Sequence, residues 1–127
     1  MGPRHQMTAR AHALLLRLLD KNQRADYDNT GGFWVGRLAD RRRYRLDRHT
    51  MQVLVFKAGE HSPFENWCAL LPNTAREDSL IAQLLLLRSD QKELKRQSYV
   101  TRLDDRGHVI QAVRDGLLNH LQQLRER

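Results

Sequence analysis

The sequence predicts a single α+β domain, in the order helix, three-stranded antiparallel meander, helix, two-strand hairpin, helix. Apolar residues recur at helical spacing in residues 8–22 and 74–96, whereas residues 33–56 show the alternation and short apolar runs of strands. A chain of 127 residues is the usual size of one domain, and no repeat or linker divides it. We assign residues 8–127 to the domain and residues 1–7 to a flexible N-terminus.

The first helix is expected to run from a cap at Thr8 to about Asn22. Its buried stripe would consist of four apolar residues: Ala11, Leu15, Leu18 and Leu19. The segment Asp26–Gly32 is rich in Asp, Asn and Gly, a composition that predicts a loop.

Three strands are predicted at Phe33–Leu38, Arg43–Asp47 and Met51–Phe56, followed by a further extended segment at Phe64–Leu71. Asp40-Arg41 offers one turn, and residues 48–50 are short enough for a hairpin. In the second strand Tyr44 and Leu46 share one face, while Arg43 and Arg45 share the other.

The second helix has the clearest local signal, because Thr74 and Glu77 stand at capping-box spacing. Leu80, Leu84, Leu87, Gln91 and Leu94 then follow at helical steps. Additional leucines and Ile81 nearly encircle this helix, so all its sides must be buried. Either it packs between the sheet and the first helix, or one side meets a second copy of the chain; the small size of the domain favours the dimer.

The C-terminal part is predicted to form a hairpin and a last helix. Tyr99–Leu103 and His108–Val113 flank Asp104–Gly107, a turn that ends on glycine. Asp115 could start the final helix, whose inward residues would be Leu117, Leu118, Leu121 and Leu124.

The composition indicates a cytoplasmic protein. Cys68 is the only cysteine, which excludes an internal disulfide and fits a reducing compartment. Apolar runs such as Leu84–Leu87 are far too short to span a membrane, and the start lacks the pattern of a secretory signal. We therefore expect no membrane partner.

Motifs for catalysis or metal binding are not found. Cys68 lies in an apolar run, which favours a buried structural thiol, and His61 lies seven residues before it across a proline-containing loop. The six histidines share no zinc-ligand spacing, and the glycines form no phosphate loop. We predict no catalytic residues, no metal, no cofactor and no enzymatic activity.

Positive charge is concentrated at the N-terminal end of the chain. The net charge is +7, and residues 1–48 contribute +6 of it, with 11 Lys and Arg against 5 Asp and Glu. The best candidates for contact with a polyanion or an acidic partner are six arginines: Arg37, Arg41, Arg42, Arg43, Arg45 and Arg48. Trp34 and Tyr44 lie among them, and aromatic rings beside guanidinium groups can stack single-stranded bases. The alternative interpretation is that these arginines only keep the sheet soluble.

The order of elements resembles that of the class I chaperones of bacterial type III secretion systems. The resemblance covers the chain from about Thr8 to the end, and it is most characteristic in the junction Ala69-Leu70-Leu71-Pro72, the leucine-rich helix and the segment Tyr99–Ile110. It implies a homodimer without enzymatic activity that holds the N-terminal segment of a secreted effector protein in an extended form.

The resemblance also implies two sets of site residues. The dimer would form through the second helix and the strand that follows it, at Leu80, Leu84, Leu87, Tyr99, Thr101 and Leu103. Pockets for the partner would be offered by Leu15, Leu19, Phe33, Val35, Val53 and Val55.

The basic charge departs from this family, which is typically acidic. The sequence therefore leaves two hypotheses: a secretion-chaperone-like protein that binds a partner polypeptide, or a small basic protein that binds nucleic acid or has a regulatory role and uses the arginine-rich meander.

Overall fold

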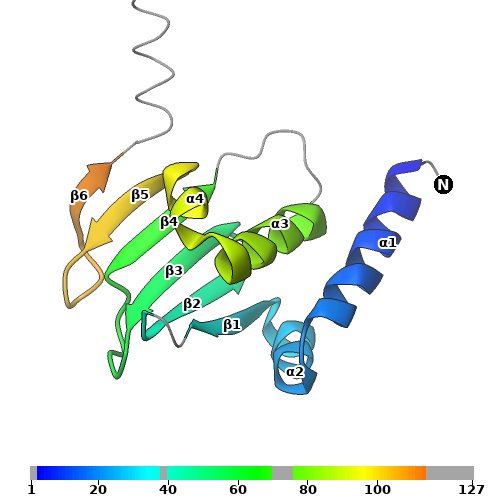
Figure 1. Ribbon diagram of the computed structural model, residues 1–127, viewed down its shortest axis with the longest axis horizontal. Helices are drawn as coiled ribbons and strands as arrows, with labels where there is room; N and C mark the ends of the chain where they lie inside the picture. Colours follow the sequence, from blue (N-terminus) through cyan, green and yellow to red (C-terminus); the bar gives the residue numbers. More distant parts are fainter. Residues whose placement is uncertain (1–2, 38–39, 70–75, 114–127) are drawn as a thin grey trace, which may run out of the picture.

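The computed structural model describes residues 3–37, 40–69 and 76–113. In chain order the elements are α1 (Pro3–Leu18), α2 (Lys21–Thr30), β1 (Gly32–Arg37), β2 (Arg42–Asp47), β3 (Gln52–Lys57), β4 (Glu65–Ala69), α3 (Arg76–Ser89), α4 (Gln91–Arg96), β5 (Ser98–Leu103) and β6 (Val109–Val113). They form one α+β domain, as predicted (Figure 1).

All the described strands belong to one antiparallel sheet of six strands, in the spatial order β1-β2-β3-β4-β5-β6. Every strand therefore pairs with its neighbour in sequence, although α3 and α4 intervene between β4 and β5 (Figure 1). The register aligns Val35 with Tyr44 and Tyr44 with Val55; farther along the sheet it aligns Val53 with Trp67 and Trp67 with Val100. Directly paired residues point to the same face, so these side chains form one continuous apolar surface.

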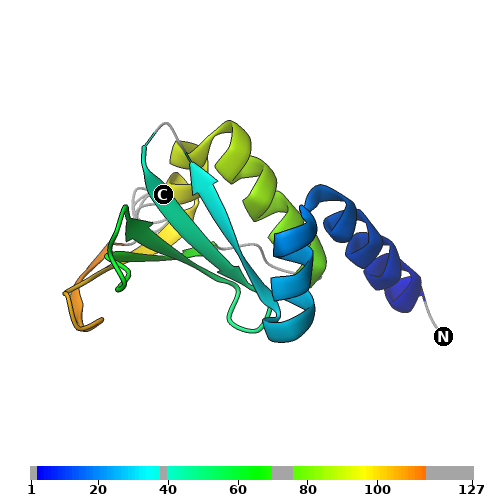
Figure 2. The ribbon, with the colours of Figure 1, turned by 90° about the horizontal axis from the view of Figure 1, so that it is seen from below.

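The described helices cover this apolar surface, and none of them lies on the other face of the sheet, which we call the uncovered side. Figures 1 and 2 show α3 and α4 on one side of the sheet, with α2 beside β1 and α1 against α3. The core joins Leu80, Leu84 and Leu87 of α3 to inward side chains such as Tyr44 and Trp67, all fully buried. Burial of each such leucine contributes roughly 1.5–3 kcal/mol, which makes this contact the main support of the fold.

The segment Asp26–Gly32, predicted as a loop, is mostly helical. Asp20 caps α2: its carboxylate accepts the Gln23 amide at 2.8 Å, and the Gln23 side chain accepts the Asp20 amide at 2.9 Å. Gly31 closes the helix in the left-handed conformation, with φ of 80°. The prediction was wrong because a reciprocal cap and a glycine C-cap can hold a helix whose interior composition is that of a loop.

Three other boundaries differ from the prediction. The extended segment after residue 63 is a full strand, β4, so the meander has four strands before α3 rather than three. The long second helix is interrupted at Asp90, whose carboxylate accepts the Glu93 amide at 3.2 Å and caps α4. α1 begins at Pro3, within the segment expected to be a flexible N-terminus.

Two predictions fall outside the described residues: the cap at Thr74 and the final helix after Asp115. The hairpin turn is confirmed, since the Gly107 amide donates to Asp104 O at 2.9 Å and Gly107 has φ of 81°.

Three of the leucines of α3 are buried within one chain. Leu80, Leu84 and Leu87 are fully buried between the sheet and the neighbouring helices, so they present no surface to a second copy. Leu85, on the outer side of α3, is 47% exposed. The packing of the helix between the sheet and α1, one of the two interpretations drawn from the sequence, describes these buried leucines, and the dimer stays a prediction.

We predict that Leu84→Ala lowers the free energy of unfolding by about 2–5 kcal/mol, because it leaves a cavity in the core. Leu85→Ala, one residue further along the same helix, is the matched control and should change stability by no more than about 0.5 kcal/mol. Urea denaturation of both variants measures the difference. Equal losses for the two would contradict the orientation of α3.

Candidate functional site

The uncovered side of the sheet carries a cluster of aromatic and arginine side chains on β1, β2 and β3. The register pairs Trp34 with Arg45 and Arg43 with Phe56, and all four alternate with inward-pointing core residues. We call these four residues, Trp34, Arg43, Arg45 and Phe56, the tryptophan–arginine face.

Arg43 is the centre of this face. Its guanidinium carbon lies 4.7 Å from the ring centroid of Trp34 and 5.7 Å from that of Phe56. The two rings meet edge-on, with centroids 5.0 Å apart. Arg43 also donates a hydrogen bond to the carbonyl oxygen of Glu60 at 3.1 Å. That acceptor is neutral, and within the described parts of the chain no carboxylate pairs with Arg43, so its positive charge can attract an anion.

The two rings differ in their access to solvent. Phe56 is buried although it points to the uncovered side, because Trp34 and Arg43 pack over it. Trp34 is 37% exposed. Its backbone is fixed from α2, since the Gln23 side-chain amide donates to Trp34 O at 2.7 Å. The face therefore offers one accessible aromatic ring on a rigid strand.

Arg45 connects the face to α2. Its guanidinium pairs with the Asp26 carboxylate and donates to the Thr30 hydroxyl oxygen at 2.9 Å, while its central carbon lies 5.4 Å from the Trp34 ring centroid. A Cβ at Gly32 would lie 3.0 Å from the Arg45 Nη2 atom and 2.7 Å from Leu46 O. The absence of a side chain at Gly32 thus lets Arg45 cross β1, where its charge is balanced by Asp26.

The six arginines predicted as one patch are divided by the sheet. Arg43 and Arg45 lie on the tryptophan–arginine face, whereas Arg42 points to the other side, with its guanidinium carbon 5.1 Å from the Phe64 ring centroid. Arg41 is exposed in the turn before β2, with φ of 55°. Arg48 lies beyond the far end of β2, over the Tyr27 ring at 5.5 Å.

The predicted patch also included Arg37, and Tyr44 was expected to lie among its arginines. Arg37 pairs with Arg42 in the register, and its side chain lies outside the described part of the structure. Tyr44 is buried in the core and cannot stack bases, so its proposed role beside Trp34 is wrong. Burial, together with the hydrogen bond from its hydroxyl to Asp40 at 2.9 Å, raises the pKa of Tyr44 to about 12.

The residues implied by the secretion-chaperone resemblance lie mostly in the interior. Six of them form part of the core and offer no surface to a partner in this structure: Leu15, Leu19, Phe33, Val35, Val53 and Val55. Tyr99 and Thr101 are partly exposed and point to the uncovered side, paired with Cys68 and Asn66. Leu103 is also partly buried.

Cys68 is half-exposed rather than buried as predicted. The alternation of β4 turns Trp67 into the core and Cys68 to the uncovered side. The apolar neighbours of Cys68 in the sequence did not reveal this, because only the register of the sheet fixes the face.

One buried charge was not predicted. The Glu65 carboxylate lies 3.4 Å from Lys95 Nζ and 3.6 Å from Arg102 Nε, and it accepts a hydrogen bond from Trp67 Nε1 at 3.2 Å. These contacts join β4, β5 and α4 on the helix-covered side. Because Glu65 is enclosed and satisfied by its neighbours, we interpret it as a structural group.

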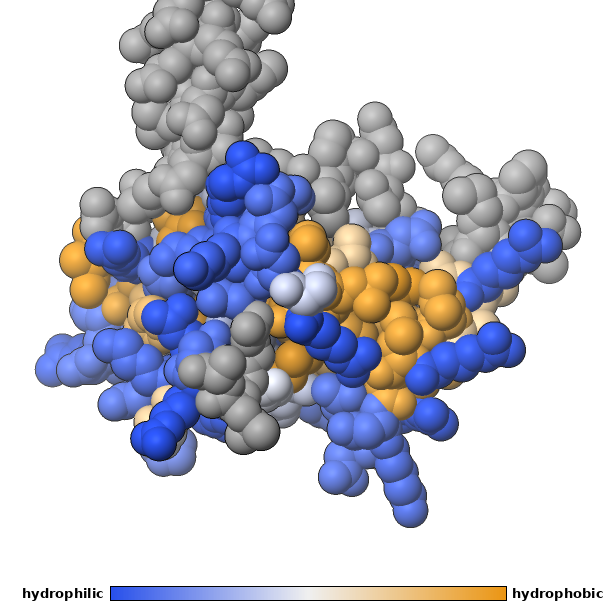
Figure 3. Space-filling model, viewed as in Figure 1, coloured by the Kyte–Doolittle hydropathy of each residue, from blue (hydrophilic) through white to orange (hydrophobic). Residues whose placement is uncertain are grey.

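The helix-covered side presents mainly apolar surface over α3 and towards α1 (Figure 3). Leu85 and Leu14 are each 47% exposed there. A smaller hydrophobic area lies over β6 (Figure 3), where Val109 and Ile110 are 65% and 67% exposed.

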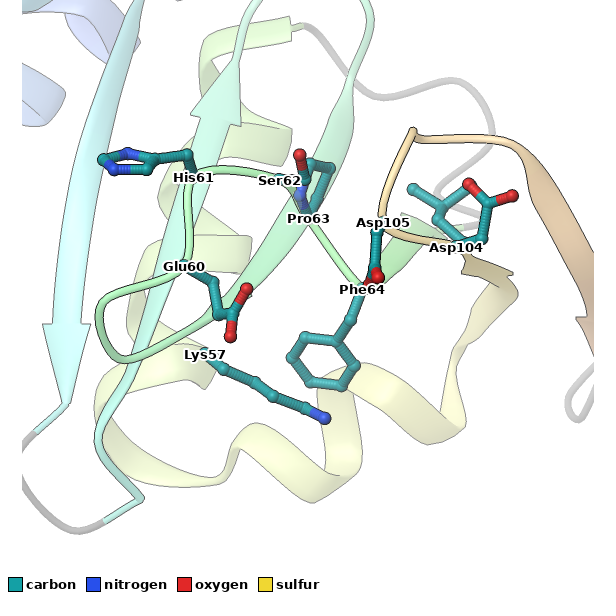
Figure 4. Close-up of a pocket in the computed structure, with 9 residues that line it drawn as sticks. Lys57, Glu60, His61, Ser62, Pro63, Phe64, Asp104 and Asp105 are labelled. Atoms are coloured by element: carbon teal, nitrogen blue, oxygen red, sulfur yellow. The ribbon is translucent and has the colours of Figure 1, made fainter.

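A pocket of about 270 Å³ lies between the β3–β4 loop and the β5–β6 turn (Figure 4). Its charged lining combines Lys57 with Glu60, Asp104 and Asp105, and the ring of Phe64 lies beneath Lys57 Nζ at 5.1 Å. The His61 ring points away from this hollow (Figure 4). The excess of carboxylates makes the pocket unsuitable for a polyanion.

Comparisons with protein-family models, curated proteins and solved structures found no match to this chain. The resemblance to secretion chaperones therefore stays a prediction. Among the described residues, no group of His, Cys, Asp and Glu is arranged to hold a metal ion, and no helix is long and apolar enough to cross a membrane.

We predict that the Asp26–Arg45 pair makes part of the stability depend on pH. The hydrogen bonds from Arg45 lower the pKa of Asp26 below its ordinary value of 3.8. Because the pKa of Asp26 is lower in the folded protein than in the unfolded chain, the ion pair contributes its full stabilisation at pH values above 3.8. This contribution is lost as the pH falls through 3.8 towards the pKa of the folded state.

Asp26→Asn should cost about 0.2–1 kcal/mol of unfolding free energy near neutral pH, and the difference from wild type should shrink by about pH 3. Asp28→Asn, at an exposed position of the same helix, is the control and should show neither effect. Denaturant titrations at the two pH values test this. A pH-independent difference for Asp26→Asn would contradict the ion pair.

Proposed function

We propose that this protein binds nucleic acid through the tryptophan–arginine face. The observation that carries the proposal is the position of Arg43, which lies beside the exposed ring of Trp34 without a carboxylate partner among the described residues. A cation next to an accessible ring on an uncovered sheet is an arrangement that suits a phosphate and its base.

The distribution of charge supports a polyanionic ligand. Residues 1–48, which include β1 and β2, carry a balance of +6, whereas the rest of the chain carries +1. Such an asymmetric field attracts polyanions towards one end of the molecule. Arg41 is exposed in the turn next to Arg43 and adds a second cation at this end.

The two arginines of the face have different tasks in this proposal. Arg45 is neutralised by Asp26 and lies over the Trp34 ring, 5.4 Å from its centroid, so it contributes mainly to positioning. Arg43 supplies the charge that contacts phosphate. A function of this kind needs no catalytic residue and no cofactor, and we expect it to be exercised in the cytoplasm.

We predict that Arg43→Ser weakens binding to a labelled oligonucleotide and reduces its dependence on salt. Each phosphate contact on a single strand contributes about 0.7 to the slope of log affinity against log salt concentration, so the slope should fall by about that amount. Fluorescence anisotropy at several salt concentrations measures both quantities.

Lys92→Ser is the matched control, because Lys92 is an exposed cation on α4, on the opposite side of the sheet. It removes the same charge and should leave the slope unchanged. If wild-type protein binds neither DNA nor RNA at about 50 mM salt, where phosphate contacts are strong, the proposed function is wrong.

A second candidate is the binding of an extended polypeptide by a homodimer, in the manner implied by the resemblance to secretion chaperones. Its support is the apolar surface of β6, the last described strand of the sheet, with Val109 and Ile110 exposed. Extended segments add to sheet edges by main-chain pairing, and apolar side chains strengthen such contacts. The partner would be the N-terminal segment of a secreted effector.

We predict for this second candidate that the protein has twice its chain mass of 14.9 kDa in solution. Ile110→Lys should weaken the capture of a partner without a loss of thermal stability, since Ile110 is exposed. Light scattering on a size-exclusion column gives the mass. A monomer at all concentrations would remove the homodimer and leave nucleic-acid binding unaffected.

A further inference from the structure

We infer that the ligand of the tryptophan–arginine face is single-stranded nucleic acid, and that an unpaired base stacks on the layer formed by Trp34 and Arg43. This inference rests on the proposed function and adds the class of ligand and the mode of contact. It follows from the exposure of one ring, the position of the guanidinium over it, and the shape of the surface.

Trp34 provides the stacking surface. It is the aromatic ring of the face with substantial exposure, at 37%, whereas Phe56 is buried beneath it and holds it edge-on at 5.0 Å. The ring is further held by Arg45, which Asp26 and Thr30 fix in turn. A ring that is already immobile loses little entropy when a base stacks on it.

Arg43 extends this surface and adds charge. Its guanidinium carbon lies 4.7 Å from the Trp34 ring centroid, within the range of a cation–π contact. Bases stack on guanidinium planes as well as on aromatic rings, so the base can stack on the Arg43 guanidinium and on the part of the indole that this guanidinium leaves exposed. The same guanidinium can then hold the adjoining phosphate.

The shape of the face favours an unpaired base over a duplex as the ligand of this platform. The residues lie on the broad side of an antiparallel sheet, between paired strands, and not on a projecting helix or ribbon that could enter a groove. In a duplex the faces of the bases are already stacked on one another. Only an unpaired base can present its face to Trp34.

The chain also contains the means to observe this contact. It has two tryptophans, and Trp67 is fully buried on the opposite side of the sheet, where its Nε1 donates to Glu65. A base that stacks on Trp34 should quench the emission of that residue and protect it from acrylamide. Trp67 should be unaffected, and its emission reports that the fold is intact.

The experiment compares four ligands with wild-type protein: a short single-stranded DNA, the same sequence as RNA, an abasic strand of equal phosphate number, and a duplex. We expect the two single strands to bind, to quench Trp34 and to exceed the abasic strand by roughly five-fold to a hundred-fold in affinity, the range of one stacked base. The duplex should compete only weakly.

Trp34→Leu should lower the affinity for the normal strand to that of the abasic strand and leave the abasic affinity unchanged, whereas Trp34→Phe should retain part of the difference. Equal affinity for normal and abasic strands, or for single strand and duplex, would overturn the inference. If that binding still weakened with salt, the proposed function would stand. Failure of every ligand to bind at low salt would overturn both. The comparison of ligands on wild-type protein decides the matter even if a Trp34 variant does not fold.

Discussion

The contact between the leucines of α3 and the inward side chains of the sheet determines everything else in this molecule. Leu80, Leu84 and Leu87 are fully buried against a surface that includes Tyr44 and Trp67. Because side chains alternate along a strand, fixing Tyr44 inward fixes Arg43 and Arg45 outward. A slip of one residue in β2 would bury two guanidinium groups, which is far more costly than any rearrangement of the surface.

None of the described helices lies over the uncovered side of the sheet, and the tryptophan–arginine face protects part of it from water. Trp34 and Arg43 shield Phe56 from water, and the cation–π contacts add to the burial of its ring. Arg45 closes the edge by reaching Asp26 on α2 across Gly32. The side chains that protect this side of the sheet from water are thus the same ones that could contact a ligand.

The choice between the two hypotheses depends on what each requires at the surface. A chaperone of the secretion type would need apolar pockets, and the six residues that were to line them are enclosed in the core. A nucleic-acid-binding protein needs an accessible ring and a cation without a fixed counter-ion, and Trp34 and Arg43 are such a pair among the described residues. The exposed Val109 and Ile110 lie on β6, at the other end of the described sheet, and they are the support for the second candidate function.

The sequence by itself determined the α+β class, the alternation of residues 43–46 and the turn at Asp104–Gly107, because these depend on spacing and on glycine within a few residues. It did not reveal α2, whose Asp20–Gln23 cap competes with a loop-like composition, or the exposure of Cys68, which the register of β4 decides. Only the tertiary structure showed that α1 and the sheet enclose Leu80, Leu84 and Leu87, and that Arg43 lies against the rings of Trp34 and Phe56. Packing between distant segments carries this information, and local periodicity cannot contain it.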